Sequence, residues 1–328
     1  MKGQIVAVRT DIPLQTIVQA VRDNISQVIV GKEQAIDLLL VSLFCQGHVL
    51  LEDVPGIGKT TLAKTLARSL DCRFQRIQFT PDLLPSDITG VSVFNQKIDE
   101  FEYRPGPIMA QIVLADEINR AGPRTQAALL EAMQERQVTV DGVTRPLPEP
   151  FLVLATQNPV ELEGTFELPE AQLDRFLMRV RLGYPDYEEE RQILRRFKAD
   201  DPLTQVEAIV TAVDVHQASH QCRQVFVHPV LEEYLLDIIH ATREQETIQL
   251  GASPRASLAL YHTSQALAAV NGRTFVTPDD IKQLVIPVLA HRLILTSEAR
   301  LRGRTAAEIL AMLLEEVPVP VEEIWETS

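Results

Sequence analysis

The feature that most constrains this chain is the segment 48–61, in which an apolar strand runs into a glycine- and proline-rich turn and then into a helix. Apolar residues at Leu62, Leu66 and Leu70 share one face of that helix. A helix that begins directly after such a turn points its first backbone N–H groups toward an anion. The segment therefore predicts a phosphate-binding loop within an α/β fold.

The loop residues have separate expected tasks. Gly56 and Gly58 let the backbone wrap closely around phosphates. Lys59 reaches the outer phosphates, and the Thr60 hydroxyl coordinates Mg²⁺. Asp53 departs from the general pattern, which has its first glycine at that position. The expected nucleotide contacts in the loop are Pro55, Gly56, Ile57, Gly58, Lys59, Thr60 and Thr61.

A second element argues against the alternative of an ordinary turn with an unrelated lysine. The apolar run 111–115 ends in two adjacent carboxylates, Asp116 and Glu117. Carboxylates are rarely buried for packing reasons alone. In a phosphate-loop fold the first acid orders Mg²⁺. We therefore assign Asp116 to the metal and Glu117 to the polarisation of an attacking water.

The rest of the chain divides into two parts. Short apolar strands alternate with amphipathic helices up to about residue 185, which predicts a mostly parallel sheet with helices on both faces. We expect an α/β nucleotide-binding core over 1–185 and a smaller all-helical domain with a C-terminal tail over 186–328. The expected strands are 48–51, 73–79, 112–115, 151–156 and 178–182. The expected helices are 33–45, 59–70, 123–135, 186–199, 206–221, 229–245, 254–270 and 278–291.

Two further stretches of the first part have the pattern of hairpins. Residues 137–145 alternate around Asp141-Gly142, a dipeptide that favours a two-residue turn. Residues 80–107 contain two alternating apolar stretches and are expected to form an insert of surface hairpins.

Charge and cysteine content limit the class of protein. The formal net charge is −14, which gives no general attraction to DNA or to an anionic membrane. The three cysteines show no paired spacing, as is typical of a reducing compartment. The first residues lack the apolar stretch of a signal peptide, and the longest apolar run is too short to span a bilayer. We expect a soluble, cytoplasmic protein without membrane insertion.

The order of these motifs resembles the MoxR family of AAA+ ATPases, over about residues 20 to 300. The resemblance is carried by the loop and by Asp116-Glu117-Ile118-Asn119-Arg120. Three later segments complete it: the strand 151–159 ending in Asn158-Pro159, the segment 168–176 ending in Asp174-Arg175-Phe176, and 251–255 ending in Ser253-Pro254-Arg255. A phosphate loop alone would not require any of these later segments.

The resemblance implies roles for further residues. Asn158 matches the sensor 1 position, which holds the water near the γ-phosphate. Arg175 matches the arginine finger, which reaches into the neighbouring subunit's site, and Arg255 matches sensor 2, which reports on nucleotide. Whether Arg255 acts within its own subunit or on the neighbour stays open. Val30 lies in a segment that looks like the lining of the adenine pocket, 137–145 matches the pre-sensor hairpin, and 80–107 matches the helix-2 insert.

The function implied by the resemblance is that of an ATP hydrolase with Mg²⁺, working as a ring that is expected to be a hexamer. Such a ring remodels or matures client proteins in the manner of a chaperone, with von Willebrand factor A domain proteins as expected partners. The helical domain would act as a lid on the nucleotide.

Other classes stay open from the sequence. A DNA-associated AAA+ motor is the main alternative, and the acidic balance and the lack of an added DNA-binding module weigh against it. A small-molecule kinase fits less well, because Glu117 and the arginine-finger candidate suit water as the acceptor. A scaffold that binds nucleotide without hydrolysis is disfavoured, because the residues expected for hydrolysis are all present: Lys59-Thr60, Asp116-Glu117 and Asn158.

Overall fold

A five-stranded parallel sheet forms the centre of the first part of the chain. This computed structural model describes residues 12–54, 56–97, 99–157, 165–198 and 201–320. The strands lie in the order β2-β5-β8-β1-β9, so each neighbouring pair is reached by a crossover. The α/β prediction and each of its strands are confirmed, with strand ends shifted by a few residues at most. The strands are β1 (Val49–Glu52), β2 (Phe74–Gln78), β5 (Ile112–Asp116), β8 (Leu152–Gln157) and β9 (Met178–Val180).

Alternating side chains of these strands enter two separate cores. Leu114 and Leu154 point to the face covered by α1, α2 and α3, whereas Val113 and Val153 point to the face covered by α5. Because both faces are buried, the strands are apolar throughout rather than alternating, which is why they could be located in the sequence. The covering helices are α1 (Leu14–Val28), α2 (Glu33–Phe44), α3 (Lys59–Ser69) and α5 (Pro123–Glu135).

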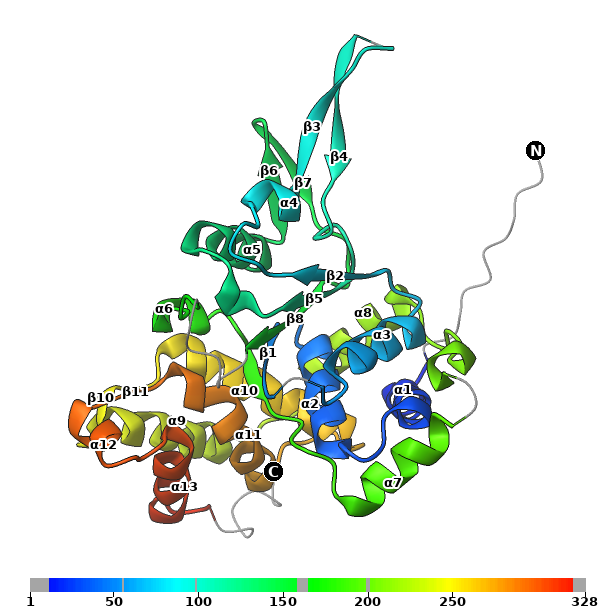
Figure 1. Cartoon of the computed structure of the whole chain (residues 1–328). Helices are drawn as coiled ribbons and strands as arrows, with labels where there is room; N and C mark the ends of the chain where they lie inside the picture. The colour runs from blue at the N-terminus through cyan, green and yellow to red at the C-terminus, as the bar shows by residue number, and fades with distance from the viewer. Residues whose placement is uncertain (1–11, 55, 98, 158–164, 199–200, 321–328) are drawn as a thin grey trace.

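The second part of the described chain is mainly helical and forms a lid region that packs beneath the sheet in Figure 1. Its α10 lies against α2, and its α11 lies against β9, so one apolar core is continuous between the two parts. The helices of this region are α7 (Tyr187–Arg196), α8 (Ala212–Arg223), α9 (Pro229–Glu244), α10 (Pro254–Val270), α11 (Pro278–Leu289), α12 (Ser297–Leu301) and α13 (Ala306–Glu316).

Three features of the helices and strands differ from the sequence expectation. The helix expected over 206–221 begins only at Ala212, because Thr211 caps it and bonds to Asp214. Helices α1, α12 and α13 were not expected, and neither were the short helices Pro85–Thr89 and Glu170–Leu173. The lid region also contains a short antiparallel pair, β10 (Ile248–Leu250) with β11 (Ile294–Leu295), where only helix was expected.

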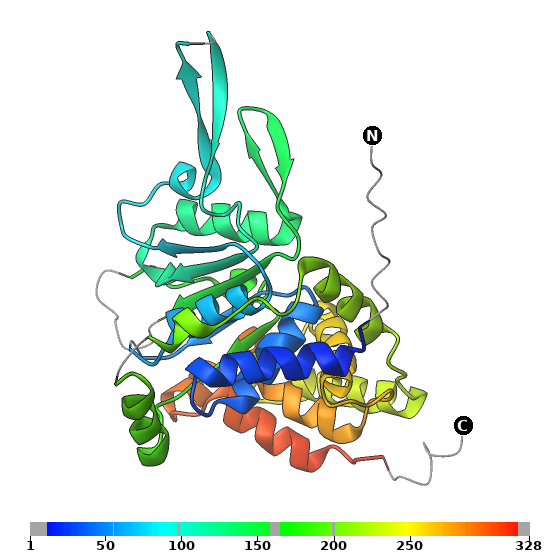
Figure 2. The same ribbon diagram turned by 90° about the vertical axis from the view of Figure 1, so that its right-hand side faces the viewer.

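Two hairpins rise side by side from one end of the sheet, on the side away from the lid (Figures 1 and 2). The expected turn is confirmed, because Asp141 and Gly142 both have positive φ, at 52° and 76°. The guanidinium of Arg145 lies 4.0 Å from the ring centroid of Tyr103 and so joins the two hairpins. The hairpins are β3 (Gly90–Asn95) with β4 (Glu100–Pro105), after the short α4 (Pro85–Thr89), and β6 (Gln137–Val140) with β7 (Val143–Pro146).

Within the described residues, none of the helices has both the length and the apolar character that crossing a bilayer requires.

Candidate functional site

The predicted phosphate loop connects the end of β1 to the start of α3. Gly56 and Gly58 adopt φ of 86° and 91°, a conformation that side-chain-bearing residues rarely take. A Cβ added at either glycine would meet no atom within 4 Å, so the backbone angle, and not crowding, favours glycine here. Pro55 lies outside the described residues.

A cavity of about 370 Å³ opens in front of this loop. It brings together the residues predicted from two distant segments, Lys59 and Thr60 from the loop and Asp116 and Glu117 from the end of β5. Thr61 and the two loop glycines also line it. The carboxyl end of a parallel sheet thus faces the start of a helix, an arrangement that suits phosphate binding.

The Lys59 ammonium is only partly surrounded by protein. It donates a hydrogen bond to the backbone carbonyl of Asp53 (2.8 Å). Burial lowers the pKa of Lys59, and the neighbouring carboxylates, Asp53 first, oppose that shift. A lysine in this setting gains most from an anionic ligand, which would replace the water it has lost.

Asp53 has a structural task that explains the departure from the usual glycine. Its buried carboxylate accepts hydrogen bonds from the backbone N–H groups of Leu182 and Gly183, the latter at 3.2 Å. Those two residues lie where the chain leaves β9 toward α7, and Gly183 has a positive φ of 67°. The side chain therefore fastens the phosphate loop to the connection that leads into the lid region.

The Asp116 carboxylate is held in a fixed orientation at the floor of the cavity. Thr156 Oγ1 donates to its Oδ1 (2.6 Å), and Arg76 donates through Nη2 (2.5 Å) and Nε (3.0 Å) to its Oδ2. Neither Arg76 nor Thr156 was predicted as a site residue. Arg76 alternates with Gln78 on β2, so both side chains point to one face, but this pattern does not show which strand lies beside β2.

Glu117 stands beside Asp116 with a left-handed backbone, at φ 57°. Its backbone N–H donates to Thr156 Oγ1 (2.8 Å), which holds this turn against β8. Its Oε2 accepts a hydrogen bond from Gln78 Nε2 (2.9 Å) and lies 3.2 Å from Arg120 Nη1. The carboxylate is partly exposed and lines the cavity, a position from which it can accept a proton from water.

The donor set of this cavity fits Mg²⁺. The Thr60 hydroxyl and the Asp116 carboxylate supply hard oxygen ligands next to Lys59. Mg²⁺ commonly takes one or two protein oxygens and fills its remaining positions with phosphate and water. The described residues contain no cluster of three or more His, Cys, Asp or Glu side chains that could hold a metal ion.

The two arginines implied by the family resemblance lie elsewhere. Arg175 and Arg255 line a second cavity of about 310 Å³, together with Arg136 and Arg292, and neither is among the described residues that line the phosphate cavity. Arg255 Nη1 is 3.7 Å from Asp174 Oδ2, and its side chain is 52% exposed. The structure therefore places Arg175 and Arg255 on one cavity, and among the described residues neither lines the cavity in front of the phosphate loop.

The remaining predicted residues are placed differently. Val30 is buried between α1 and α2 and is not among the residues that line the described part of the phosphate cavity. Asn158 lies outside the described residues, immediately after the end of β8.

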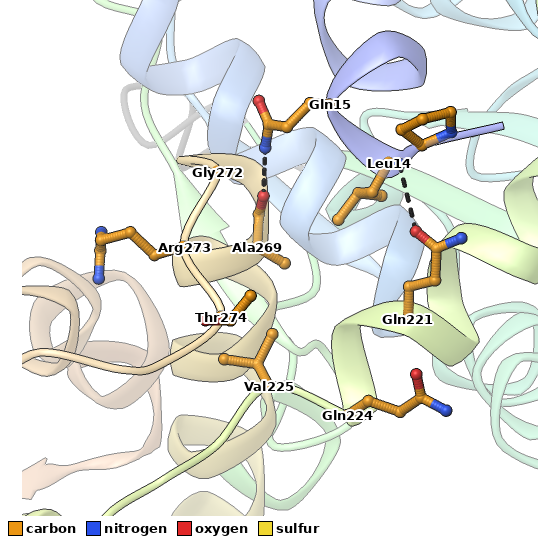
Figure 3. A pocket seen from close by; sticks show the side chains of 10 residues that line it. Leu14, Gln15, Gln221, Gln224, Val225, Ala269, Gly272, Arg273 and Thr274 are labelled. Carbon is orange, nitrogen blue, oxygen red and sulfur yellow. Dashed lines mark hydrogen bonds between the residues drawn. The ribbon is translucent and has the colours of Figure 1, made fainter.

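A further pocket, shown in Figure 3, lies where the start of α1 meets the ends of α8 and α10. Leu14 N donates to Gln221 Oε1 (3.2 Å), and Gln15 Nε2 donates to the Ala269 carbonyl (2.5 Å). Arg273, the charged residue in its lining, is paired with Asp280 at 2.5 Å. These bonds connect α1 to α8 and α10, so the pocket is explained by the packing of these helices.

Comparisons with known proteins agree with this geometry. Residues 48–178 match the ATPase family associated with various cellular activities (AAA), and residues 240–313 match the AAA lid domain. YeaC of Bacillus subtilis is 50% identical over 92% of this chain and 94% of its own length. The chaperone MoxR1 of Mycobacterium tuberculosis is 43% identical over 90% of this chain and 81% of its own. A crystal structure of a candidate ATPase from Cytophaga hutchinsonii superposes with a TM-score of 0.88 at 42% identity, and the match covers 94% of this chain and 96% of that one.

Proposed function

Because this chain belongs to the MoxR family of AAA ATPases, we propose that it hydrolyses Mg²⁺-bound ATP at sites completed by a neighbouring subunit. The subunits would form a ring, which we propose is a hexamer. The energy of hydrolysis would serve to remodel or mature client proteins.

The observation that carries this proposal is the separation of Arg175 and Arg255 from the phosphate cavity. Negative charge builds on the γ-phosphate and leaving oxygens during phosphoryl transfer, and an arginine placed there can raise kcat by about 10³–10⁵. Arg76, the arginine that lines the described part of the phosphate cavity, is already bonded to Asp116. An arginine for the transferring phosphate would therefore come from a second copy, whose Arg175 and Arg255 share one open cavity. We propose that both act in trans.

The residues of the phosphate cavity would divide the remaining work. Lys59 and the N–H groups of the loop bind the phosphates, while Thr60 and Asp116 hold Mg²⁺, which neutralises phosphate charge when bound. Glu117 takes the proton of the attacking water. The family resemblance adds Asn158 as the residue that orients this water and Val30 as part of the adenine pocket.

The division into core and lid would let ATP binding and hydrolysis drive a movement within each subunit. We propose that the core over 1–185 and the lid over 186–328 shift against each other with nucleotide state. Asp53 would transmit that shift, because it bonds to Leu182 and Gly183 at the connection between them. The name of the mycobacterial relative, a chaperone, supports a protein client. Von Willebrand factor A domain partners rest on the family resemblance alone.

Nucleotide binding and hydrolysis can be tested with a lysine pair on one helix. We expect Lys59→Ala to weaken ATP binding by roughly 10- to 100-fold, because a hydrogen bond to a charged group contributes about 1.5–3 kcal/mol. Lys64→Ala is the matched control, because Lys64 is an exposed residue of the same helix α3. Binding is measured with a fluorescent ATP analogue, and turnover is measured as phosphate released to water in the presence of Mg²⁺.

Two results would contradict the proposal. Equal loss of ATP binding in Lys59→Ala and Lys64→Ala would show that Lys59 has no specific role in binding phosphate. Phosphate transfer to an added metabolite, without release to water, would favour a kinase.

A further inference from the structure

The turn over residues 174–177, which contains Arg175, is held by the lid region as well as by the core. It joins α6 (Glu170–Leu173) to β9. On the core side, Leu177 N donates to the carbonyl of His48 (2.8 Å), and the Phe176 side chain is fully buried. On the lid side, the short helix η3 (Ala290–Arg292) packs against the same turn.

Arg292 makes most of the bonds from the lid to this turn. Its Nε donates to Asp174 Oδ1 (2.8 Å), and its Nη2 donates to the carbonyl of Phe176 (2.7 Å). Its Nη1 donates to the carbonyls of Leu177 (3.0 Å) and Val288. The side chain is only 3% exposed. A buried guanidinium needs such partners to offset its lost hydration, and its planar fork can serve several acceptors at once.

His291 adds a second bond to the same carbonyl. Its Nε2 donates to the carbonyl of Phe176 (3.1 Å), and the ring is buried. Burial, and then the adjacent Arg292 cation, lower the pKa of His291 well below its usual value, so the ring stays neutral. The residues on both sides of Arg175, Asp174 and Phe176, are thus bonded to the lid.

Asp174 extends the cluster to Arg255. Its Oδ1 accepts from Arg292, while its Oδ2 lies 3.7 Å from Nη1 of Arg255. Arg255 belongs to α10 of the lid, and Arg175 belongs to the core. The carboxylate of Asp174 therefore contacts both Arg292 and Arg255, and Asp174 directly precedes Arg175 in the chain.

We propose that Arg292 is a positioning residue that fastens the Arg175 turn to the lid, so that Arg175 and Arg255 are presented to the neighbouring subunit as one unit. If the lid shifts with the nucleotide bound to its own subunit, Arg175 would shift with it relative to the phosphate cavity of the neighbouring subunit. This inference rests on the proposed action of Arg175 in trans. The new element is that Arg175 moves with the lid of its own subunit, although Arg175 belongs to the core.

The test uses full-length subunits with complementary defects. Arg292→Gln should bind ATP with unchanged affinity, because its own phosphate cavity is untouched. It should lower kcat by about a hundredfold, the scale of loss when a reacting group is misplaced by about 1 Å. The Glu117→Gln subunit is the complement, because it cannot hydrolyse ATP but has an intact Arg175 turn.

Mixing these two inactive subunits separates a defect in the finger from a defect in the phosphate cavity. Where an Arg292→Gln subunit binds ATP and a Glu117→Gln subunit supplies the arginine, the site is complete. With random head-to-tail mixing at equal amounts, about a quarter of the interfaces are of this kind. We expect turnover to rise to about a quarter of that of the unmodified ring.

Two control variants keep the result interpretable. Arg273→Gln removes another partly buried lid arginine, which pairs with Asp280 at 2.5 Å and bonds to Thr277 in its own part of the lid. It should lower the melting temperature with little change in kcat. Arg292→Lys keeps the positive charge but not the fork, and it serves as the test if Arg292→Gln fails to fold.

The outcomes distinguish the inference from the function on which it rests. If Arg175→Ala regains turnover on mixing with Glu117→Gln but Arg292→Gln and Arg292→Lys do not, the positioning role is wrong and the trans arginine stands. If Arg175→Ala also regains nothing, the proposal of sites completed by a neighbour fails, and the inference fails with it. Normal kcat in both Arg292 variants would overturn the inference directly.

Discussion

Replacement of Arg175 by alanine should lower kcat by about 10³-fold or more, the range in which an arginine supplied to a phosphoryl-transfer site contributes. ATP should bind the altered subunit as before, because Arg175 lines a different cavity from Lys59 and Thr60. The charge that stabilises the transition state would be lost from the neighbour's site and the binding contacts would remain. Steady-state phosphate release and equilibrium ATP binding, measured on the same preparation, check both parts.

The control for this variant is Arg302→Ala in the lid, whose side chain is 70% exposed and paired with Glu298 on the surface. It should leave kcat within about twofold, because exposed ion pairs contribute little. A normal kcat in Arg175→Ala would show that this residue is not the arginine of the site.

Glu117→Gln should lower kcat by about 10²–10⁴-fold while ATP stays bound, because the amide keeps the shape of the side chain but cannot take a proton from water. The phosphate contacts of Lys59 and Thr60 are not altered. The expected result is a subunit from which ATP, not ADP, is recovered after gel filtration with Mg²⁺. Single-turnover phosphate release gives the rate directly.

The matched variant is Glu131→Gln, an exposed glutamate on α5. It removes one negative charge without touching the phosphate cavity and should hydrolyse ATP normally. If Glu117→Gln releases phosphate at the rate of Glu131→Gln, another group takes the proton, and the role given to Glu117 is wrong.

Most of the α/β fold and the central residues of the phosphate cavity could be predicted from the sequence. Strands buried on both faces are apolar throughout, so β1, β5 and β8 were evident. Lys59 was assigned to the phosphates and Asp116 to Mg²⁺ from their motifs, and in a parallel sheet the ends of both strands lie at the same edge. In the structure both residues line one cavity, and their roles there stay a prediction.

The partners of these residues were not evident, because they depend on strand order. Arg76 and Gln78 reach Asp116 and Glu117 only because β2 pairs with β5 in a register that sets Gln78 opposite Asp116. Arg292 was also missed, since the turn it holds lies more than a hundred positions earlier in the chain. No local pattern marks such pairings.

Helix starts were predictable where capping signals were used, and they were missed where those signals were overlooked. The helix expected from residue 186 is α7, and Asp186 caps it by accepting a bond from Glu189 N (2.8 Å). The same kind of signal, a threonine followed three positions later by an acid, precedes both α8 at Thr211 and α13 at Thr305. Its use would have corrected the start of α8 and revealed α13.

The most direct test of the account is ATP turnover per subunit as a function of protein concentration, with Mg²⁺ present and sedimentation run on the same samples. Sites completed by a neighbour's Arg175 and Arg255 predict a rate per subunit that rises with the fraction of associated subunits and vanishes in the monomer. Full turnover by a species that sediments as a monomer would contradict the account, because it would show that one chain contains every group the reaction needs.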